Sequence, residues 1–182
     1  GTNWAYLPYG PFANLKSYDS WVIENQGLED PVFLAIVEKE SGCTLGIASY
    51  LRIHPAKGSI EVGHIHFSPL LQRTTSATES MFLMMQWAFE AGYRRYEWKC
   101  NALNQASRSA AQRLGFSFEG IFRQMMIVKG RNRDTAWFAA IDREWPALKT
   151  AFERYLDEKN FNEEGRPVTS LSSLTAPLLH KK

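Results

Sequence analysis

The chain has 182 residues, of which 45% are hydrophobic and 13% aromatic, and its formal net charge is +2. This composition excludes a disordered chain, and the length supports one domain with a real core. The small net charge gives no electrostatic argument for binding nucleic acid or a membrane surface, and no apolar run reaches the ~18 residues that a membrane span needs. With only Cys43 and Cys100, we expect no disulfide framework and favour a reduced, cytoplasmic setting.

The first half of the sequence predicts an arm, a short helix and three strands. Residues 1–13 interleave aromatic side chains with prolines, which predicts an extended aromatic arm. Residues 14–26 are predicted as a short helix. Three antiparallel strands joined by turns follow, over residues 31–38, 44–53 and 59–67.

The second half alternates helices and strands. One helix is predicted from a polar loop to about Ala91, and a second from Asn104 as N-cap to Leu114, where Gly115 stops it. The other predicted elements are a strand over 95–99, a hairpin of strands 116–128 and 135–141 with its tip at 129–134, a helix over 145–156 and a partly mobile tail over 158–182. This order predicts a single α+β domain over residues 1–157, with a mixed, mostly antiparallel central sheet flanked by helices.

The polar loop before the first long helix is the strongest chemical signal. It is rich in hydroxyl groups, spans residues 72–78 and follows the strand that ends at Phe67. The first N–H groups of a helix have no partner inside it, and the helix dipole favours negative charge there. The loop therefore predicts an anion-binding pocket, with an ordinary capped helix as the alternative.

Two blocks of sequence carry a family resemblance. Residues 72–77 read Gln-Arg-Thr-Thr-Ser-Ala and are followed by Thr-Glu, and residues 104–107 read Asn-Gln-Ala-Ser and lead to Leu-Gly-Phe at 114–116. In order and spacing they resemble the phosphate loop and the second signature of the GNAT superfamily of acetyl-CoA-dependent N-acetyltransferases. Within it, the ribosomal-protein alanine acetyltransferases are the most similar branch. The resemblance covers about residues 31–142.

The resemblance implies acetyl-CoA as co-substrate, no metal, and a set of cofactor-binding residues. Backbone amides and hydroxyls of the loop would hold the diphosphate, and residues at the start of the second helix would contact the pantetheine arm. The alternative for Asn104 and Ser107 is a helix-capping pair, and one residue can fill both roles. The implied cofactor-binding residues are Phe67, Gln72, Arg73, Thr74, Thr75, Ser76, Ala77, Thr78, Asn104 and Ser107.

Three departures from the family pattern stand out. The inner glycine of the loop is Thr75, which still offers its N–H if its φ is negative. The tyrosine that reprotonates the departing thiolate in many members is replaced by Ala111, as is common in the branch named above. The family's first strand and part of its first helix would precede residue 1, so we expect an N-terminally shortened member.

The catalytic base is predicted among three residues of the strand before the loop: Glu61, His64 and His66. Strand alternation places Glu61 on one face and both histidines on the other, unless a bulge intervenes. A base from either set is compatible with the sequence. The alternative is a half-buried strand whose polar residues are satisfied.

Other candidates are interpreted as structural. Met81, Met84 and Met85 are predicted to be core, and Cys100 a structural thiol, since no base stands at a recognisable spacing from it. The cations of residues 129–133 are predicted to form a solvated hairpin tip, with Arg131 or Arg133 paired to Asp134. Trp98 and Trp137 are predicted to be core or cleft wall.

The resemblance implies direct attack of an amine on acetyl-CoA in a ternary complex. Because no unmistakable base is present, an α-amine or a small amine is favoured over Lys as acceptor. One alternative is an acyl-CoA-binding regulatory module with weak or no transfer, suggested by Thr75 and Ala111. Another is a nucleic-acid- or ribosome-associated protein that uses the 129–133 hairpin, whose basic patch is short. No membrane or nucleic-acid partner is expected, and a homodimer stays open.

Overall fold

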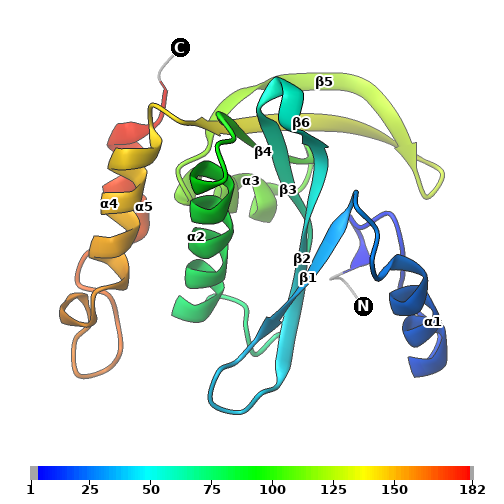
Figure 1. Ribbon diagram of the computed structural model, residues 1–182, viewed down its shortest axis with the longest axis horizontal. Helices are drawn as coiled ribbons and strands as arrows, with labels where there is room; N and C mark the ends of the chain where they lie inside the picture. The colour runs from blue at the N-terminus through cyan, green and yellow to red at the C-terminus, as the bar shows by residue number, and fades with distance from the viewer. Residues whose placement is uncertain (1–3, 181–182) are drawn as a thin grey trace.

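A six-stranded sheet forms the centre of the molecule in the computed structural model, which describes residues 4–180 (Figure 1). The strands lie in the order β1-β2-β3-β4-β6-β5, and only β3 and β4 are parallel. This confirms the predicted mixed, mostly antiparallel sheet. The strands are β1 (Val32–Val37), β2 (Thr44–His54), β3 (Ser59–Phe67), β4 (Arg95–Asn101), β5 (Ser117–Val128) and β6 (Arg131–Ile141).

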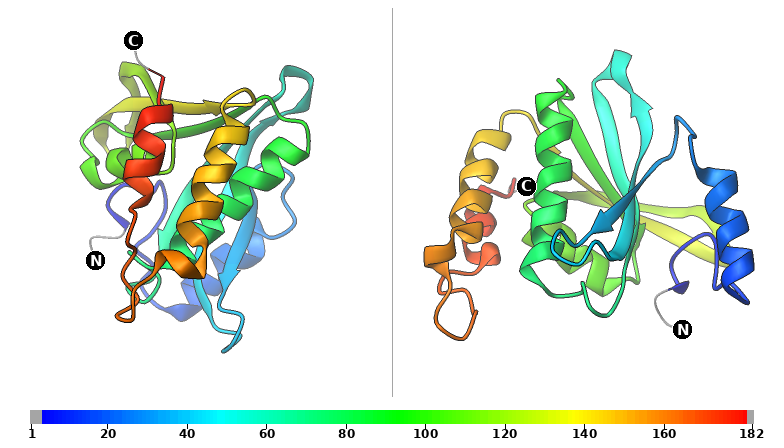
Figure 2. Two further views of the ribbon diagram at one scale, coloured as in Figure 1. Left: turned by 90° about the vertical axis from the view of Figure 1, so that its left-hand side faces the viewer. Right: turned by 60° about the horizontal axis from the view of Figure 1, so that its bottom comes forward.

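Helices cover the two faces of the sheet unequally. Four helices lie on one face and α1 lies on the other, beside β1 and β2 (Figures 1 and 2). The N-terminal arm shares the face of α1, so we call this the α1 face. The helices are α1 (Leu15–Asn25), α2 (Thr75–Glu90), α3 (Gln105–Arg113), α4 (Trp145–Leu156) and α5 (Leu171–Thr175), with short 3₁₀ turns at Pro55–Lys57, Glu158–Asn160 and Ala176–Leu178.

The core lies between the sheet and the helices of the opposite face. Met81, Met84 and Met85 are buried there, which confirms the structural interpretation of the methionines on α2. The Tyr50 hydroxyl donates to the carbonyl oxygen of Met84 at 2.8 Å and so ties β2 to α2. At the end of α3, Gly115 has a φ of +87°, and a side chain there would clash with Leu148 of α4. Gly115 therefore both ends the helix and permits close packing.

Strands β3 and β4 separate part of the way along their length. Their pairing runs from Ser59 with Arg95 to Val62 with Trp98 and goes no further. Beyond that point β3 stays with β2 up to Phe67, while β4 stays with β6 up to Asn101. In Figure 1 the β5–β6 hairpin crosses the top of the picture while β1–β3 run down it, so the two halves of the sheet diverge. We call the resulting gap between the strands the split.

A bulge in β3 decides which residues face α1. Ser49 of β2 pairs with Gly63 and Ile47 pairs with His66, so β3 has one extra residue in this interval. That residue, His64, has a φ of +50°. A bulge shifts the alternation of side chains by one position. As a result His66 lies on the same face as Glu61, although simple alternation would put them on opposite faces.

The arm and the hairpin tip differ from the sequence prediction. The arm, described from Trp4 onward, is not extended but folds into turns whose aromatic rings pack together. The hairpin tip is only Lys129-Gly130, both at positive φ, and β6 already begins at Arg131. Two left-handed residues suit the twist of a tight hairpin, which lets the strands pair right up to the turn.

The predicted mobile tail contains packed structure. Within residues 158–180, α5 lies against α3 and α4. Leu171 is fully buried, and the Thr175 hydroxyl donates to the carbonyl oxygen of Arg113 at 3.0 Å. Five helical residues are too few to show a periodic pattern, so the sequence carries little signal here.

None of the helices within residues 4–180 combines the length and the apolar character that a membrane span requires.

The packing of the tail predicts a stability effect. Leu171→Ala should lower the free energy of unfolding by about 2–5 kcal/mol, because it removes a fully buried side chain and leaves a cavity. Val168→Ala is the matched control in the same segment, since Val168 is 75% exposed, and should change it by less than about 0.5 kcal/mol. Urea unfolding measures both. Equal effects of the two substitutions would show that the tail does not stabilise the domain.

Candidate active site

The start of α2 presents backbone N–H groups that have no partner. The N–H groups of Arg73, Thr75 and Ser76 donate to no other group within residues 4–180. The loop is held by N–H groups of Leu71 and Gln72, which both donate to the carbonyl oxygen of Ser68 at 3.0 Å. Free N–H groups at a helix N-terminus are suited to bind an anion.

The backbone of the loop accommodates threonine where the family pattern has glycine. Thr75 is the first residue of α2 and does not have a positive φ. The left-handed residue of the loop is instead Arg73, with a φ of +64°. Thr75 therefore meets the condition under which its N–H stays available.

Several loop side chains are already engaged in capping and packing. Thr74 is the N-cap of α2, and its hydroxyl accepts from the N–H of Ala77 at 3.1 Å. The Gln72 amide donates to the carbonyl oxygen of Phe67 at 2.8 Å. The buried Thr78 hydroxyl accepts from Arg113 of α3 at 2.8 Å. The side chains of these three predicted cofactor-binding residues are therefore engaged within the protein, and the N–H groups of Gln72 and Thr74 also have backbone partners.

The start of α3 has the predicted caps. Asn104 is the N-cap, and its side-chain oxygen accepts from the N–H of Ser107 at 3.1 Å. The Ser107 hydroxyl also accepts from the indole N–H of Trp98 at 3.0 Å. Ala111 is fully buried in the core, so a tyrosine at this position would need the core to repack. The start of α3 therefore has capping residues that lie next to β4, and position 111 provides no acidic group.

His64 lies on the α1 face with one ring nitrogen oriented by a neighbour. Its Nδ1 is 3.0 Å from the Ser49 hydroxyl oxygen, and that hydroxyl is 3.3 Å from the carbonyl oxygen of Gly63. If the hydroxyl donates to Gly63 and accepts from Nδ1–H, then Nε2 carries the free lone pair. The ring stacks on Phe33 at a centroid distance of 5.1 Å. Burial lowers the pKa of the imidazole, as does the charge of Arg52, which favours the neutral form.

His66 lies under the N-terminal arm. Its ring is 4.0 Å from that of Trp4, and its Nε2 is buried without a hydrogen-bond partner among the described residues. Burial lowers its pKa as well. Tyr9 of the arm lies beside His64 at a centroid distance of 5.6 Å. The arm thus forms an aromatic wall next to both histidines.

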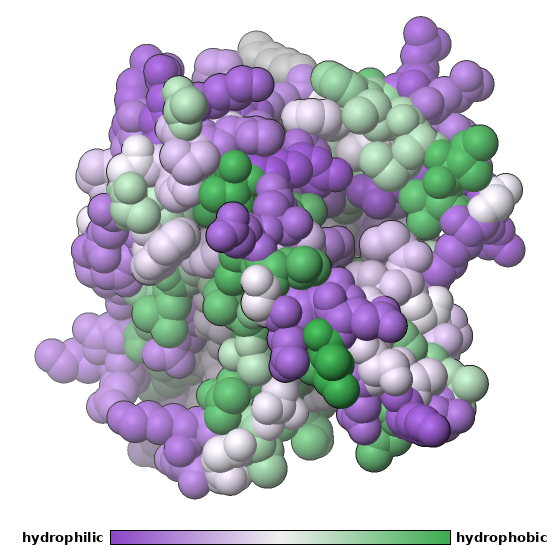
Figure 3. Space-filling view, turned by 45° about the vertical axis from the view of Figure 1, so that its right-hand side comes forward, coloured by the Kyte–Doolittle hydropathy of each residue, from purple (hydrophilic) through white to green (hydrophobic). Residues whose placement is uncertain are grey.

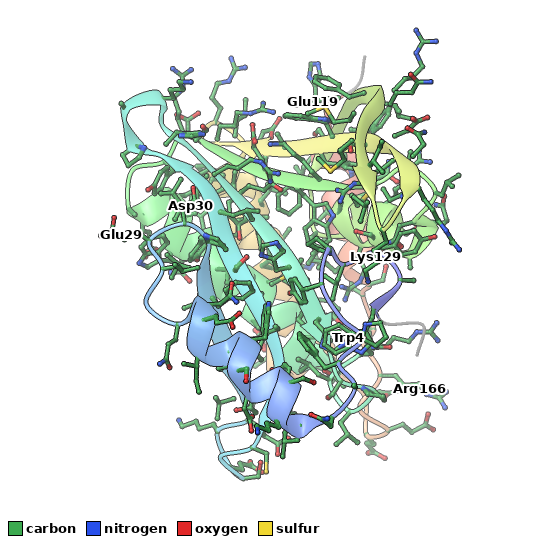
Figure 4. The ribbon with its side chains drawn as sticks, turned by 90° about the vertical axis from the view of Figure 1, so that its right-hand side faces the viewer. Trp4, Glu29, Asp30, Glu119, Lys129 and Arg166 are labelled. Carbon is green, nitrogen blue, oxygen red and sulfur yellow. The ribbon has the colours of Figure 1, made fainter. Side chains whose placement is uncertain are left out.

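Lys129 attaches the arm to the β5–β6 hairpin. Its ammonium group donates to the carbonyl oxygens of Trp4, Tyr9 and Gly10, at 3.0, 3.1 and 2.6 Å. Figure 4 shows Trp4 and Lys129 close together. On the face that comes forward in Figure 3, apolar and polar residues are intermixed. Lys129 lies exposed at the hairpin tip, as predicted, and it also binds carbonyl groups that are at least 119 positions away in the sequence, which the sequence did not indicate.

Glu61 is the centre of a buried ion network. It is 3% exposed, and its carboxylate lies 2.8 Å from the Arg52 guanidinium and 2.7 Å from the Lys99 ammonium group. Lys99 also lies 2.7 Å from Glu97. Burial raises the pKa of the Glu61 carboxyl, although the two cations act in the opposite direction. A carboxylate held by two cations is less free to take a proton from a substrate than the histidines.

Asp30 supports this network from the loop before β1, and nothing in the sequence singled it out (Figure 4). Its carboxylate oxygens accept from the N–H groups of Arg52 and Ile53, at 2.9 and 3.1 Å. Arg52 has a φ of +49°, so the backbone is bent where its side chain turns toward Glu61. An acidic residue in a loop was too weak a signal to predict this contact with a distant strand.

Of the remaining predictions, the ion pair of Asp134 does not form, whereas Cys100 and the two tryptophans lie as expected. Asp134 accepts from the N–H of Gln124 at 2.7 Å and from the Asn132 amide at 2.9 Å, and it forms no ion pair with Arg131 or Arg133. Cys100 is buried, and burial raises the pKa of its thiol, in agreement with a structural role. Trp98 lies in the core, and Trp137 lies under the Lys99 ammonium group, 3.9 Å from the centre of its ring.

The comparison with protein families and the comparison with solved structures agree on one family. The model of the GNAT acetyltransferase domain matches residues 2–117. No curated protein matches the sequence. Among solved structures, a GCN5-related N-acetyltransferase from Brucella melitensis is 45% identical, with a TM-score of 0.93 over 96% of this chain and 80% of that chain.

Two further structures extend this comparison. A probable acetyltransferase of the GNAT family from Chromobacterium violaceum ATCC 12472 is 46% identical, with a TM-score of 0.77 over 80% of this chain and 74% of that chain. RimL, a ribosomal L7/L12 α-N-protein acetyltransferase solved in complex with coenzyme A, is 28% identical, with a TM-score of 0.50 over 54% of this chain and 56% of that chain.

The lowered pKa of His64 predicts a pH dependence of stability. In the unfolded chain a histidine binds a proton near its ordinary pKa of about 6.5, whereas folded His64 binds it only at lower pH. Its contribution to the free energy of unfolding is therefore complete above pH 6.5 and decreases as the pH falls below that value. We expect His64→Gln to lose less stability than the wild type between pH 7.5 and 5.5 in urea unfolding.

The exposed His54 of β2 provides the control for this experiment. His54→Gln makes the same substitution at an exposed position. If His64→Gln and the wild type lost the same amount of stability, burial of the His64 imidazole would not disfavour its protonation.

Proposed function

The chain belongs to the GNAT acetyltransferase family, and we propose that it transfers the acetyl group of acetyl-CoA to a primary amine by direct attack in a ternary complex. The α-amine of a peptide or a small amine is the favoured acceptor. A role in acetylating ribosomal proteins is a narrower version of this proposal, supported by the similarity to RimL. The observation that carries the proposal is the set of free N–H groups at the start of α2, beside the split.

Each part of this region would have a separate task. The N–H groups of Arg73, Thr75 and Ser76 would hold the diphosphate, and residues near Asn104 would contact the pantetheine arm as it enters the split. Beyond Val62, β3 has a strand neighbour on one side only, so N–H groups that face the split are available for the oxyanion of the tetrahedral intermediate.

His64 is our candidate for the general base. It lies at the bulge beside the split, it favours the neutral form, and Ser49 orients its ring. A base must be unprotonated and its reactive nitrogen must face the substrate. His66 is the second candidate, and Glu61 is the least suited of the three because Arg52 and Lys99 hold its carboxylate.

The weak basicity of His64 favours an α-amine. An α-amine has an ordinary pKa of about 7.7–8.0 and a Lys amine one of about 10.4, so deprotonating Lys costs roughly 3.5 kcal/mol more. Burial lowers the pKa of His64 and so makes it a weaker proton acceptor. Such a base suits an amine that is already partly neutral at pH 7.

Removing a single N–H group tests the diphosphate site. Thr75 occupies the first helical position, where proline is tolerated, and the ψ of 164° at Thr74 suits a residue before proline. Thr75→Pro should weaken acetyl-CoA binding about tenfold to a hundredfold, the cost of one hydrogen bond to a charged group, in isothermal titration calorimetry. Thr75→Ala keeps the N–H and should stay within about threefold of the wild type. Equal binding by Thr75→Pro and the wild type would exclude this N–H from the site.

An acceptor screen tests the reaction itself. With acetyl-CoA, peptides that have a free N-terminus should be acetylated with a kcat/KM at least about 100-fold above N-terminally blocked peptides that have one free Lys. His64→Gln should lower kcat/KM for the α-amine by about 10²–10⁴. Release of CoA thiol and mass spectrometry measure turnover. A preference for Lys contradicts the assignment of the acceptor, and acetyl-CoA binding without any turnover favours the regulatory module.

A further inference from the structure

A small cavity on the α1 face lies apart from the N–H groups of the loop. Its volume is about 100 Å³, enough for several water molecules and so for one carboxylate or phosphate group. Among the residues that the structure describes, three cations and no acidic residue line it. The lining residues are Arg52, Lys99, Met125, Met126, Arg133, Thr135 and Trp137.

The sheet brings these residues together from four strands. Arg133, Thr135 and Trp137 alternate along β6, so all three point to the same face. Trp137 pairs with Lys99 of β4, and the guanidinium of Arg52 approaches from β2 over Glu61. The two methionines come from the irregular part of β5, where the register with β6 shifts. No short segment of sequence contains the cavity.

Hydrogen-bond donors in this region have no partner. The Nε of Arg133, the hydroxyl of Thr135 and the Nε1 of Trp137 are buried, and none of them bonds within the described residues 4–180. Thr135 is only 2% exposed. A buried donor without a partner destabilises the fold, so a ligand or water is expected to satisfy these groups. Since Arg Nε and Trp Nε1 only donate, the ligand has to supply acceptor atoms.

The local charge indicates an anion. Lys99 and Arg52 are paired with Glu61, but Arg133 forms no ion pair within the described residues. Burial lowers the pKa of the Arg133 guanidinium, as does the charge of Arg52, whereas the nearby charge of Glu61 acts in the opposite direction without forming an ion pair with it. A carboxylate or phosphate would supply both the missing charge and the missing acceptors.

The position of the cavity excludes the diphosphate of acetyl-CoA as the anion that would bind there. Lys99 is one residue beyond Trp98, where the pairing of β3 with β4 ends, so the cavity borders the split. It lies on the face of His64 and His66, whereas α2 and its loop lie on the opposite face. The diphosphate proposed for the loop is therefore not the group that would bind here.

We propose that this cavity binds an anionic group of the acceptor, so that the substrate is an amine carrying a carboxylate or phosphate. Neighbouring strands are about 4.8 Å apart, and the cavity lies one to two strands from the split, so the anion would be roughly 5–10 Å from the reacting nitrogen. An acidic side chain just after a peptide N-terminus meets this spacing, and so does a small aminocarboxylate or aminophosphate. This inference rests on the proposed acetyl transfer.

Matched acceptors test the inference. The peptides Ala-Glu-Ala-Ala and Ala-Gln-Ala-Ala, both amidated, differ only in the charge near the amine, and 4-aminobutyrate, its amide and 3-aminopropyl phosphate form the small-molecule arm. We expect kcat/KM to be at least about tenfold higher for the anionic member of each pair, the value of one charged hydrogen bond. A preference in the peptide arm alone assigns the anion to a peptide, and one in the small-molecule arm alone assigns it to a metabolite.

Variants locate the preference in the cavity. Arg133→Gln should reduce the ratio of kcat/KM between the Glu and Gln peptides toward one. Thr135→Val, which keeps the shape of the side chain, should reduce it in part and provides a second test if Arg133→Gln does not fold. Arg131→Gln is the control: it removes the same charge from an exposed position of β6 and should keep the wild-type ratio.

The outcomes separate this inference from the proposed function. If both peptides are acetylated at equal rates, the transferase activity stands and the anion site is overturned. If no amine is acetylated, the proposed function fails, and the site is judged by the indole N–H resonance of Trp137 during titration with the Glu peptide or inorganic phosphate. A shift in the wild type that is lost in Arg133→Gln supports the site, and no shift overturns it.

Discussion

Strands β3 and β4 pair over only four positions and then follow different neighbours, because each has a second strand to which it stays hydrogen-bonded. The sheet cannot keep both sets of contacts as its two halves diverge, so the strands part beyond Val62 and Trp98. Backbone groups that face the gap lose their sheet partners, which is costly unless a ligand or water replaces them. The loop that begins α2, the two histidines and the cationic cavity all lie around this gap, and their proposed roles depend on it.

The charged residues beside the gap favour a polar ligand. Glu61 is almost fully buried between Arg52 and Lys99. The attraction between buried charges offsets the free-energy cost of removing them from water only when the contacts are close, as they are on both sides of Glu61. Among residues 4–180, no carboxylate forms an ion pair with Arg133. An apolar substrate would leave this charge and the neighbouring donors unsatisfied, whereas an anionic one completes their hydrogen bonds.

The N-terminal arm and the β5–β6 hairpin enclose the α1 face from two sides. Lys129 holds three carbonyl oxygens of the arm, and the arm in turn packs Trp4 against His66. A lysine with three donors suits three converging carbonyl groups, so one side chain joins segments from opposite ends of the chain. The aromatic wall beside the histidines therefore depends on the hairpin as well as on the arm.

Local patterns in the sequence determined the order of the elements, the caps at Asn104 and Gly115 and the loop before α2, because each depends on residues within a few positions of one another. The family motifs are of the same kind. Only the tertiary structure decided that the bulge at His64 brings Glu61 and both histidines to one face, that Lys129 holds the arm, and that Arg133 lines a cavity with residues of three other strands. These features depend on strand register and on contacts between distant segments, which no local pattern specifies.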